Sequence, residues 1–372
     1  MVKVGIVTVS YNGMGDTLEL LESGKKLETE GMEVRWIVVD NGSTDKLVEN
    51  VQKMYPKVDV VQTGENLGFT GGYNRGLRYA YAMGADYVLI INNDTTIADK
   101  DVLEKMLETM EKAGVGVVAP KIWFEPGFEF HKDRYEKKDE GKVIWYAGGD
   151  FDWDNLMSKH RGIDGVDTGR YDGVEEVDFV SGCCFLIRRE VLKEVGYLDE
   201  RLFAYFEDND WIVRVMRAGW KLVYDGRVGI YHKVSRTAGI GSPAADYYIT
   251  RNRLEFAKSY ARWRTKWSVA KEAVRMLVAG REWQRRGVVD WMRGMWGAME
   301  KKDAGRTEWL VKVSIAIVNY KTKTFTNKLL QSIAKYCPEA EVVVLDNGSG
   351  EDFAVKKFIS SPVNLGFSGG YN

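Results

Sequence analysis

Residues 66–74 read Asn-Leu-Gly-Phe-Thr-Gly-Gly-Tyr-Asn, and residues 364–372 repeat them with one change as Asn-Leu-Gly-Phe-Ser-Gly-Gly-Tyr-Asn. The tetrapeptide Asp-Asn-Gly-Ser precedes both stretches, at 40–43 and again at 346–349. A repeat of this length does not arise from composition alone. We therefore predict two copies of one folding unit, with the second copy truncated after its glycine-rich stretch.

Around the first copy, short apolar runs alternate with amphipathic stretches. The expected strands are Val4–Val9, Val34–Val39, Val58–Val61 and Tyr87–Ile91, and the expected helices are Asp16–Glu30, Lys46–Met54, Arg75–Met83 and Val102–Lys112. Continuous apolar strands that alternate with helices predict a parallel sheet covered on both faces. The fold class is therefore α/β, Rossmann-like, with a mostly parallel sheet.

The pattern changes further along the chain. Charged, glycine and aromatic residues dominate Glu125–Asp172. We interpret this segment as an insertion that lies at the edge of the sheet or over the functional site. A strand is expected at Val177–Ile187, with helices from about Arg188 and over Asp208–Ala218, and a linker at Ala304–Arg306. We predict three parts: a catalytic α/β domain at 1–246, a basic helical segment and linker at 247–308, and the truncated repeat at 309–372.

Composition limits the classes of protein. The chain has 372 residues, a net charge of -1 and 45% hydrophobic residues, which indicates a globular protein and argues against a general polyanion binder. Its three cysteines (Cys183, Cys184 and Cys337) form no disulfide framework. No apolar run reaches the roughly 18 residues of a membrane span, and no signal peptide is visible. We expect a cytoplasmic protein.

Polar clusters follow three of the predicted strands. They are Ser10–Asn12, Asp40–Ser43 and Asn92–Asp94. Any one of them is explained by a turn or a helix cap, because these are turn residues. In an open α/β sheet, however, ligands bind beyond the carboxyl ends of the strands. Together the three clusters predict one binding cleft.

The chain must hold phosphate without a glycine-rich nucleotide loop. No G-x-G-x-x-G follows the first strand, which disfavours a dinucleotide dehydrogenase, and no G-x-x-x-x-G-K-[ST] is present. Asp94 offers a hard oxygen ligand for Mg²⁺ or Mn²⁺ bridging a diphosphate. His232 follows a strand-like run and is a plausible second metal ligand, whereas His131 and His160 are expected at the surface.

Glu207–Trp211 (Glu-Asp-Asn-Asp-Trp) is the strongest catalytic candidate. Acidic residues in a first helical turn are favoured by the helix dipole, so capping is the simple explanation. Three acids beside the aromatic run Phe203–Phe206 exceed what a cap requires. Their mutual repulsion can raise one pKa and create a general base.

Taken together, these residues resemble the family 2 glycosyltransferases with a GT-A fold, especially the rhamnosyltransferase-like members. The resemblance covers about Lys3–Tyr260 and again Val313–Asn372. It depends on the motifs Val-Ser-Tyr-Asn, Asp-Asn-Gly-Ser, Asn-Leu-Gly-Phe-x-Gly-Gly-Tyr-Asn, Asn-Asn-Asp, Ser-Gly-Cys-Cys-Phe-Leu-Ile-Arg-Arg, Phe-Glu-Asp-x-Asp-Trp and Tyr-Tyr-x-x-Arg-Asn. It implies an inverting, metal-dependent transfer from a UDP- or dTDP-sugar donor to a glycan or lipid-linked glycan.

The resemblance also implies roles for individual residues. Asp208 is the base that deprotonates the acceptor hydroxyl, and Asp94 with His232 holds the metal. Asp40 accepts the imide N–H of a uracil or thymine base, beside Tyr11. Gly182, Glu207 and Trp211 line the sugar and acceptor pocket. The full predicted donor site comprises Ser10, Tyr11, Asn12, Asp40, Gly42, Asn66, Gly71, Asn74, Asn93 and Asp94.

Two motifs depart from related families. The metal motif D-x-D is here Asn92-Asn93-Asp94, so one carboxylate carries the metal contact and metal affinity is expected to be modest. The Gln-x-x-Arg-Trp motif of processive synthases is absent. We therefore expect the transfer of one or a few sugars rather than polymerisation.

The segment 247–302 is strongly basic, with fourteen Lys and Arg against five Asp and Glu, and it contains five Trp. A basic, Trp-bearing amphipathic helix is typical of peripheral binding at a membrane surface, which would suit a lipid-linked acceptor at the inner face. The alternative is a helical cap on the catalytic domain with solvated charges. Nothing else in the sequence supports nucleic-acid binding.

Two other functions are alternatives to that of a glycosyltransferase. A sugar-1-phosphate nucleotidyltransferase would need a Gly-rich, basic loop after the first strand, which Ser10–Gly13 does not provide. A non-catalytic nucleotide- or glycan-binding module does not require the acids of Glu207–Trp211. The second copy lacks counterparts of Asp94, Asp208 and His232 and is expected to be inactive.

Overall fold

The computed structural model describes residues 1–234, 242–299, 314–336, 341–355 and 357–361. The chain divides into two compact units, Met1–Ala270 with Arg286–Met299, and Lys271–Arg285 with Glu300–Asn372. Within the described residues, no helix is both long and apolar enough to cross a membrane.

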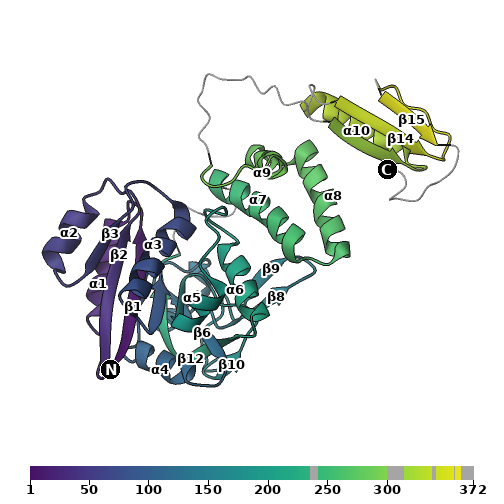
Figure 1. The fold of residues 1–372 in the computed structure, drawn as a ribbon. Coiled ribbons are helices and arrows are strands. Elements are labelled where there is room, and N and C mark those ends of the chain that lie inside the picture. The colour runs from purple at the N-terminus through teal and green to yellow at the C-terminus, as the bar shows by residue number, and fades with distance from the viewer. Residues whose placement is uncertain (235–241, 300–313, 337–340, 356, 362–372) are drawn as a thin grey trace. The chain divides into compact units, whose positions relative to one another are not determined.

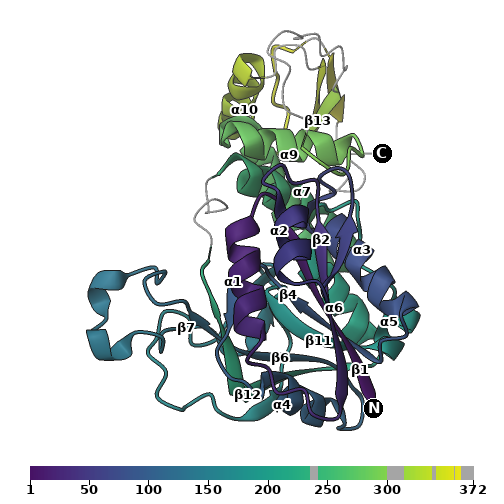
Figure 2. The same ribbon diagram turned by 90° about the vertical axis from the view of Figure 1, so that its left-hand side faces the viewer.

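A ten-stranded mixed sheet forms the centre of the first unit (Figures 1 and 2). Its strands are β1 (Val2–Ser10), β2 (Met32–Asp40), β3 (Asp59–Gln62), β4 (Tyr87–Ile91), β5 (Thr95–Ile97), β6 (Val115–Phe124), β7 (Ile144–Tyr146), β10 (Val174–Glu176), β11 (Cys184–Arg188) and β12 (Lys221–His232). The main order is β10-β12-β6-β11-β4-β1-β2-β3, with β5 beside β12 and β7 beside β6.

The run β4-β1-β2-β3 is parallel throughout, as is the pair β6 and β12. β11 lies between β4 and β6 and is antiparallel to both. Apolar side chains of these strands are almost fully buried because helices cover the sheet. The predicted α/β fold with a largely parallel central sheet is confirmed.

Helices α1 (Met14–Gly24), α2 (Leu47–Met54), α3 (Gly68–Ala82), α4 (Val102–Met110), α5 (Arg189–Val195) and α6 (Glu207–Arg217) flank the sheet. The helical segment that follows comprises α7 (Pro243–Tyr260), α8 (Trp263–Ala279) and α9 (Glu282–Met292), drawn in green in Figure 1. Ser242 caps α7 by accepting a hydrogen bond from the Ala245 N–H, and Pro243 occupies the first turn.

The glycine-rich stretch is the first half of a helix. We expected a helix only from Arg75, but α3 begins at Gly68. A Cβ atom at Gly72 would lie 2.7 Å from Val9 Cγ1, and one at Gly76 would lie 2.3 Å from Val7 Cγ1. These glycines therefore allow α3 to approach the sheet more closely than any other residue would permit.

Other predicted boundaries also change. The first helix ends at Gly24 rather than Glu30, and the strand expected over Val177–Ile187 is confined to β11. The Glu125–Asp172 insertion contains β7, two short 3₁₀ turns, η1 (Lys132–Arg134) and η2 (Lys137–Asp139), and a hairpin of β8 (Gly149–Asp152) and β9 (Met157–His160). Strands this short leave too few residues to show a periodic pattern.

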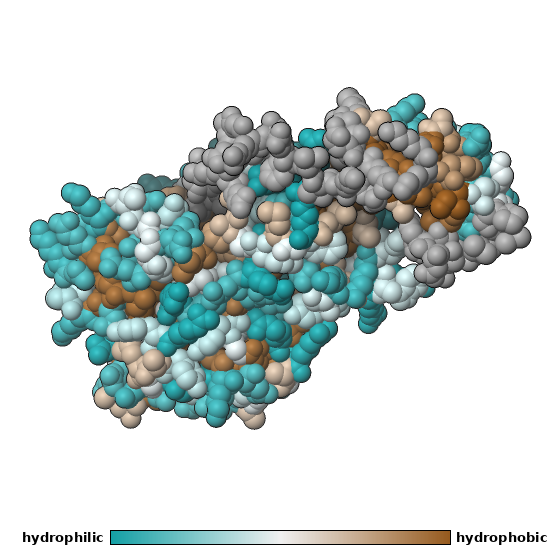
Figure 3. Space-filling view, turned by 45° about the horizontal axis from the view of Figure 1, so that its top comes forward, coloured by the Kyte–Doolittle hydropathy of each residue, from teal (hydrophilic) through white to brown (hydrophobic). Residues whose placement is uncertain are grey.

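The second unit contains a small parallel sheet. Its strands β13 (Ser314–Asn319), β14 (Glu341–Asn347) and β15 (Lys357–Ser361) are adjacent in chain order, and α10 (Lys323–Tyr336) connects the first two. The strand order matches that of β1, β2 and β3. Ile317, Ile333, Val344 and Phe353 form its core, and apolar side chains also gather on its surface (Figure 3). The repeat of 364–372 and the linker at 304–306 lie outside the described residues.

Candidate active site

The three polar clusters meet at the carboxyl edge of the parallel strands. Ser10 and Asp40 are partners in the register of β1 and β2, and the Asn41 N–H donates to Ser10 O at 2.9 Å. Asn12, in the left-handed region, accepts from the Thr44 N–H at 2.8 Å. Asn93 Nδ2 lies 3.3 Å from Gly13 O, which brings the third cluster to the first. The predicted convergence is therefore present.

Asp40 lies at the wall of an open cleft. Its side chain is mostly buried, and its Oδ1 accepts a hydrogen bond from the Ser43 N–H at 2.9 Å. The cleft beside it is also lined by Ser43, Thr44 and Gln62. Tyr11 remains 53% exposed at the end of β1. A buried carboxylate at the wall of a cleft, with an exposed aromatic ring at the end of the neighbouring strand, suits recognition of a planar, hydrogen-bonding base.

Two of the predicted donor residues, Gly42 and Asn66, hold the loop structure together with their neighbour Asn41. Asn41 Nδ2 donates to Gly68 O at 3.0 Å, and Asn41 Oδ1 accepts from the Leu67 N–H at 3.0 Å. Asn66 Oδ1 accepts from the Gly68 N–H at 2.9 Å. Gly42, with a φ of 81°, lies so close to Glu65 that a Cβ atom would be 2.7 Å from its carbonyl carbon. These contacts fix the start of α3 against the Asp40 turn.

Asn74 and Trp211 must be reassigned. Asn74 is fully buried, and its amide donates to Leu198 O and accepts from the Leu198 N–H. Trp211 is 1% exposed, and its Nε1–H donates to Gly196 O at 2.9 Å. Both side chains have their polar groups satisfied inside the protein. We therefore assign Asn74 and Trp211 to the core rather than to the donor or acceptor pocket. Ser10 and Gly71 are also buried, at 0% exposure for Ser10.

Asp94 and His232 form a close pair, with His232 Nε2 3.2 Å from Asp94 Oδ1. The antiparallel pairing of β5 with β12 sets His232 opposite Thr95, directly after Asp94. A carboxylate oxygen and an imidazole nitrogen are ligands that Mn²⁺ and similar cations accept. No group of three or more His, Cys, Asp or Glu residues able to hold a metal occurs among the described residues. The pair fits a cation whose remaining ligands come from elsewhere.

The two other histidines, His131 and His160, lie in different environments. His131 is exposed near Asp164, as expected. His160, expected at the surface, instead packs edge-on against Trp145, whose ring also contacts His232, with centroid distances of 4.5 and 4.6 Å. Burial lowers the pKa of His160 to about 4, so this histidine is neutral at pH 7. Trp145, which belongs to the segment Glu125–Asp172, thus contacts the predicted metal ligand His232.

Asp208 and Glu207 begin α6 after a loop with unusual backbone angles. Phe203, Tyr205 and Phe206 have φ values of 67°, 64° and 68°. Asp208 is partly exposed, its Oδ1 accepts from the Asn209 N–H at 2.7 Å, and its Oδ2 lies 3.4 Å from the Gly182 N. These contacts hold the carboxylate of Asp208 at the surface of the loop.

The two neighbouring acids have different environments. Burial raises the pKa of Asp208 above the usual range of an aspartate. Burial, with the charge of Asp208, raises the pKa of Glu207 well above its usual range. Glu207 is 6% exposed, and its Oε2 has no hydrogen-bond partner among the described residues. Asp208 is therefore the accessible carboxylate of the two and the better candidate for proton transfer.

Short connections link the Asp94 and Asp208 regions. The Asn92 N–H donates to Cys183 O at 2.8 Å, and Gly182, next in the chain, faces Asp208. Tyr73 OH donates to Ile91 O and Asn92 Oδ1, both at 3.0 Å. Burial raises the pKa of Tyr73 well above its usual value, so this phenol stays protonated at neutral pH. Tyr73 was not predicted, although its motif was.

The Asp40 cleft, the Asp94–His232 pair and Asp208 thus lie along the carboxyl edge of a largely parallel, GT-A-like sheet. The sequence family model Glycosyl transferase family 2 matches residues 5–196. The chain belongs to this family and is a glycosyltransferase. The nucleotidyltransferase and binding-module alternatives are therefore set aside.

Two similar proteins are named as rhamnosyltransferases. The chain is 27% identical over 247 residues to an N-acetylglucosaminyl-diphospho-decaprenol L-rhamnosyltransferase of Mycobacterium tuberculosis, covering 63% of this chain and 77% of the relative. It is 23% identical over 224 residues to the dTDP-rhamnosyl transferase RfbF of Shigella flexneri, covering 58% and 68%.

Among solved structures, similarity extends to Staphylococcus aureus TarS 1-349 in complex with UDP-GlcNAc. The TM-score is 0.49 at 17% identity, over 79% of this chain and 80% of that chain. The mannosyltransferase PcManGT of Pyrobaculum calidifontis, solved with GDP-Man and Mn²⁺, gives a TM-score of 0.46 at 16% identity, over 78% and 74%.

Proposed function

We propose that the first unit transfers a sugar, with inversion, from a UDP- or dTDP-sugar to a hydroxyl of a glycan or lipid-linked glycan. The observation that carries this proposal is the placement of three aspartates, Asp40, Asp94 and Asp208, around one sheet edge with three different environments. The three environments suit base recognition, metal binding and proton transfer, respectively.

For the donor, the Asp40 carboxylate has one oxygen occupied by the Ser43 N–H. The other oxygen would accept the imide N–H of uracil or thymine, with Tyr11 packing against the base. Asp94 and His232 would hold a divalent cation. Such a cation neutralises the charge that develops on a leaving diphosphate. The naming of a dTDP-rhamnosyl transferase among the relatives supports a pyrimidine donor.

For the transfer itself, Asp208 would take the proton of the acceptor hydroxyl. The acceptor oxygen then forms a bond to the anomeric carbon as the bond from that carbon to the diphosphate breaks. A single displacement of this kind needs one base and inverts the configuration. Glu207, being buried, is poorly placed to act as a second carboxylate. Gly182 keeps the space beside Asp208 open, since a Cβ atom there would lie 3.4 Å from Asp208 Oδ2.

Replacing Asp94 with alanine is expected to abolish the metal dependence of nucleotide binding. Removal of the only carboxylate in the pair leaves His232 alone, which cannot hold Mg²⁺ or Mn²⁺ against water. Titration calorimetry with UDP and dTDP, with and without Mn²⁺, measures this directly. The matched control is Asp133→Ala, at an exposed 3₁₀ turn. Equal Mn²⁺ enhancement in Asp94→Ala and wild type would rule out this metal site.

We also propose that α8 contacts an anionic membrane surface, where a lipid-linked acceptor would be found. Trp263, Trp267 and Val274 are 73%, 40% and 48% exposed, at spacings that set them on one helical face. Exposed cations flank this apolar face, including Lys266, Lys271 and Arg275. The decaprenol in the name of a relative supports a lipid-linked acceptor.

In a vesicle-sedimentation assay, Trp263→Ala with Trp267→Ala is expected to weaken binding to phosphatidylserine-containing vesicles by about tenfold or more, because two interfacial anchors are lost. Trp153→Ala, which removes an equally exposed indole (40%) from the β8–β9 hairpin, serves as the control. Unchanged binding of the double variant would refute the docking face.

We further propose that the second unit has no transferase activity of its own. The carboxylate of Asp346, which corresponds to Asp40, accepts hydrogen bonds from Asn319 Nδ2, the Gly350 N–H and the Ser349 side chain. Burial raises its pKa, but these hydrogen bonds outweigh burial and lower the pKa overall. The carboxylate is thus already occupied within its own unit.

A chain that stops after Gly305 is accordingly expected to keep the turnover of the full chain. Initial-rate assays of the two proteins, after circular dichroism has shown both to be folded, make the comparison. Lost turnover in a folded, shortened protein would show that the second unit contributes to the reaction.

A further inference from the structure

Two polar residues of α7, Arg251 and Asn252, are completely buried, with 0% exposure each. They belong to the motif Tyr247-Tyr248-x-x-Arg251-Asn252, which the proposed function does not use. Buried polar side chains of this size require partners. Their partners lie about 50 positions earlier in the chain, in the loop that leads to Asp208.

Asn252 binds the main chain of this loop. Its Nδ2 donates to the carbonyl oxygens of Leu202, Ala204 and Tyr205, at 2.9, 2.8 and 2.7 Å. An amide group carries two N–H donors, so three carbonyls share them. One side chain therefore binds three carbonyl groups of the loop.

Arg251 supports Asn252 and extends the contact. Arg251 Nε donates to Asn252 Oδ1 at 3.0 Å, which sets the amide orientation so that Nδ2 faces the loop. Its NH2 group donates to Leu202 O at 2.9 Å and to Arg201 O at 3.2 Å. The guanidinium lies 5.1 Å from the ring centroids of both Tyr247 and Tyr248. An arginine held by two rings and two loop carbonyls has little freedom to move.

The loop itself needs such support. Phe203, Tyr205 and Phe206 adopt left-handed backbone conformations that bulky residues avoid. Conformations of this kind persist only where the surrounding structure imposes them. On the side of the loop that contacts α3, Phe203 O accepts from the Thr70 N–H at 3.2 Å. The loop is thus fixed between α3 and α7.

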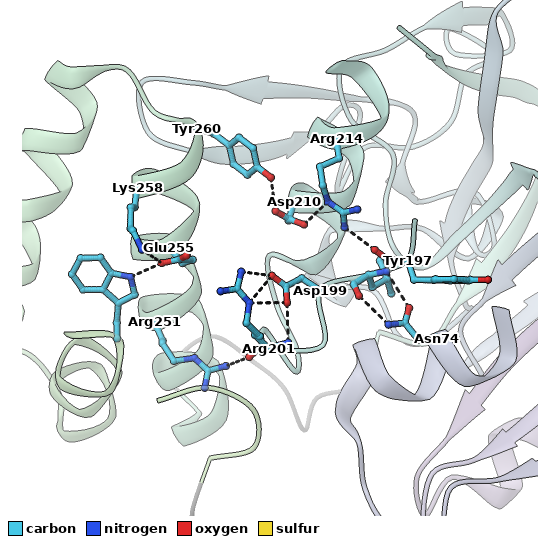
Figure 4. A network of polar contacts seen from close by, with 12 residues as sticks. Asn74, Tyr197, Asp199, Arg201, Asp210, Arg214, Arg251, Glu255, Lys258 and Tyr260 are labelled. Atoms are coloured by element: carbon cyan, nitrogen blue, oxygen red, sulfur yellow. Dashed lines mark hydrogen bonds and ion pairs between the residues drawn. The ribbon is translucent and has the colours of Figure 1, made fainter. Parts of the chain in front are cut away.

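α7 also binds the chain just after Asp208. Tyr260 OH donates to Asp210 Oδ1 at 2.6 Å, and Arg214 Nε donates to Asp210 Oδ2 at 2.9 Å (Figure 4). Figure 4 shows Arg251 and Tyr260 reaching from the same helix towards the loop and α6. Asp208 is therefore bracketed by α7 contacts on both sides in the sequence.

We propose that Arg251, Asn252 and Tyr260 are positioning residues that hold Asp208 at the distance and angle needed for proton transfer. The inference rests on the proposed role of Asp208 as the base. None of the three touches the donor cleft beside Asp40. Loss of a contact should therefore lower kcat and leave donor binding unchanged.

The test compares Asn252→Ala and Tyr260→Phe with Trp291→Phe. The control removes a hydrogen bond from α9 to Glu255 on α7 (3.0 Å) without touching the loop or Asp210. We expect kcat to fall about 100-fold for Asn252→Ala and about fivefold for Tyr260→Phe, with donor KM within about threefold, a pattern that marks a lost transition-state interaction. Trp291→Phe should keep wild-type kcat. If Asn252→Ala does not fold, the kcat of Tyr260→Phe alone tests the positioning role.

An Asp208→Asn background separates the two claims. If Asp208→Asn alone keeps wild-type turnover, the base assignment fails whatever Asn252 does. If Asp208→Asn loses turnover but folded Asn252→Ala and Tyr260→Phe keep wild-type kcat, the positioning role is overturned. A positioning role predicts that Asn252→Ala costs nothing further when Asp208 is already asparagine, because both changes remove the same interaction. An additional loss of the same size in that background would also overturn it.

Discussion

Asp208→Asn is expected to lower kcat by about 10³-fold while nucleotide binding is retained, because asparagine keeps the shape but cannot accept the acceptor proton. The amide oxygen of asparagine can keep the 2.7 Å hydrogen bond from the Asn209 N–H, and only the long 3.4 Å contact with the Gly182 N–H is lost, so the loop should keep its structure. Initial-rate kinetics and calorimetry with the nucleotide measure the two effects separately.

The neighbouring carboxyl provides the comparison. Glu207→Gln is expected to reduce kcat much less, since Glu207 is buried and points away from solvent. Because burial raises the pKa of Asp208, its carboxylate gains a proton as the pH falls, and wild-type activity should decline at a pH above the usual range of an aspartate. Wild-type turnover in Asp208→Asn, or a larger loss in Glu207→Gln, would contradict the assignment.

Gly76→Ala is expected to reduce the free energy of unfolding by about 3 kcal/mol, the upper end of typical overpacking costs. The added Cβ atom would lie 2.3 Å from Val7 Cγ1 and 3.0 Å from Val39 Cγ2, in the tightest part of the contact between α3 and the sheet. Neither β-branched side chain can rotate away freely. Because the entropy of unfolding grows with chain length, the midpoint of thermal unfolding should fall by about 4–5 °C for a chain of this size.

Gly15→Ala is the matched control, because a Cβ atom at this helical glycine of α1 meets nothing within 4 Å. There, alanine should be neutral or stabilising by up to about 1 kcal/mol through its higher helix propensity. If both variants melt at the same temperature in scanning calorimetry, the close approach of α3 to β1 is wrong.

The parallel half of the sheet, and the carboxyl edge at which Asp40 and Asp94 both lie, could be predicted from the sequence. Their signals are local, because each buried strand is a continuous apolar run and each polar cluster follows its strand directly. The pairing of β5 with β12 brings His232 next to Asp94. The two residues must lie close together if both are to bind one metal ion.

The start of α3, the inward position of Asn74 and Trp211, and the β8–β9 hairpin could not be predicted. Glycine is usually a loop signal, and only the distance from Gly72 and Gly76 to β1 shows that these glycines serve packing instead. The identity of Asn74 does not reveal that it bonds Leu198, more than a hundred residues away. Likewise, the Arg251-Asn252 motif was visible, but its partners at 201–205 depend on tertiary structure.

The central claim, a pyrimidine-nucleotide and metal site formed by Asp40, Asp94 and His232, is tested most directly by thermal shift with UDP, dTDP and GDP, each with and without Mn²⁺. Ligands that bind the native state raise its stability. We predict that UDP or dTDP, but not GDP, raises the melting temperature, and does so only with Mn²⁺. Absence of any shift with all three nucleotides would contradict the proposed site.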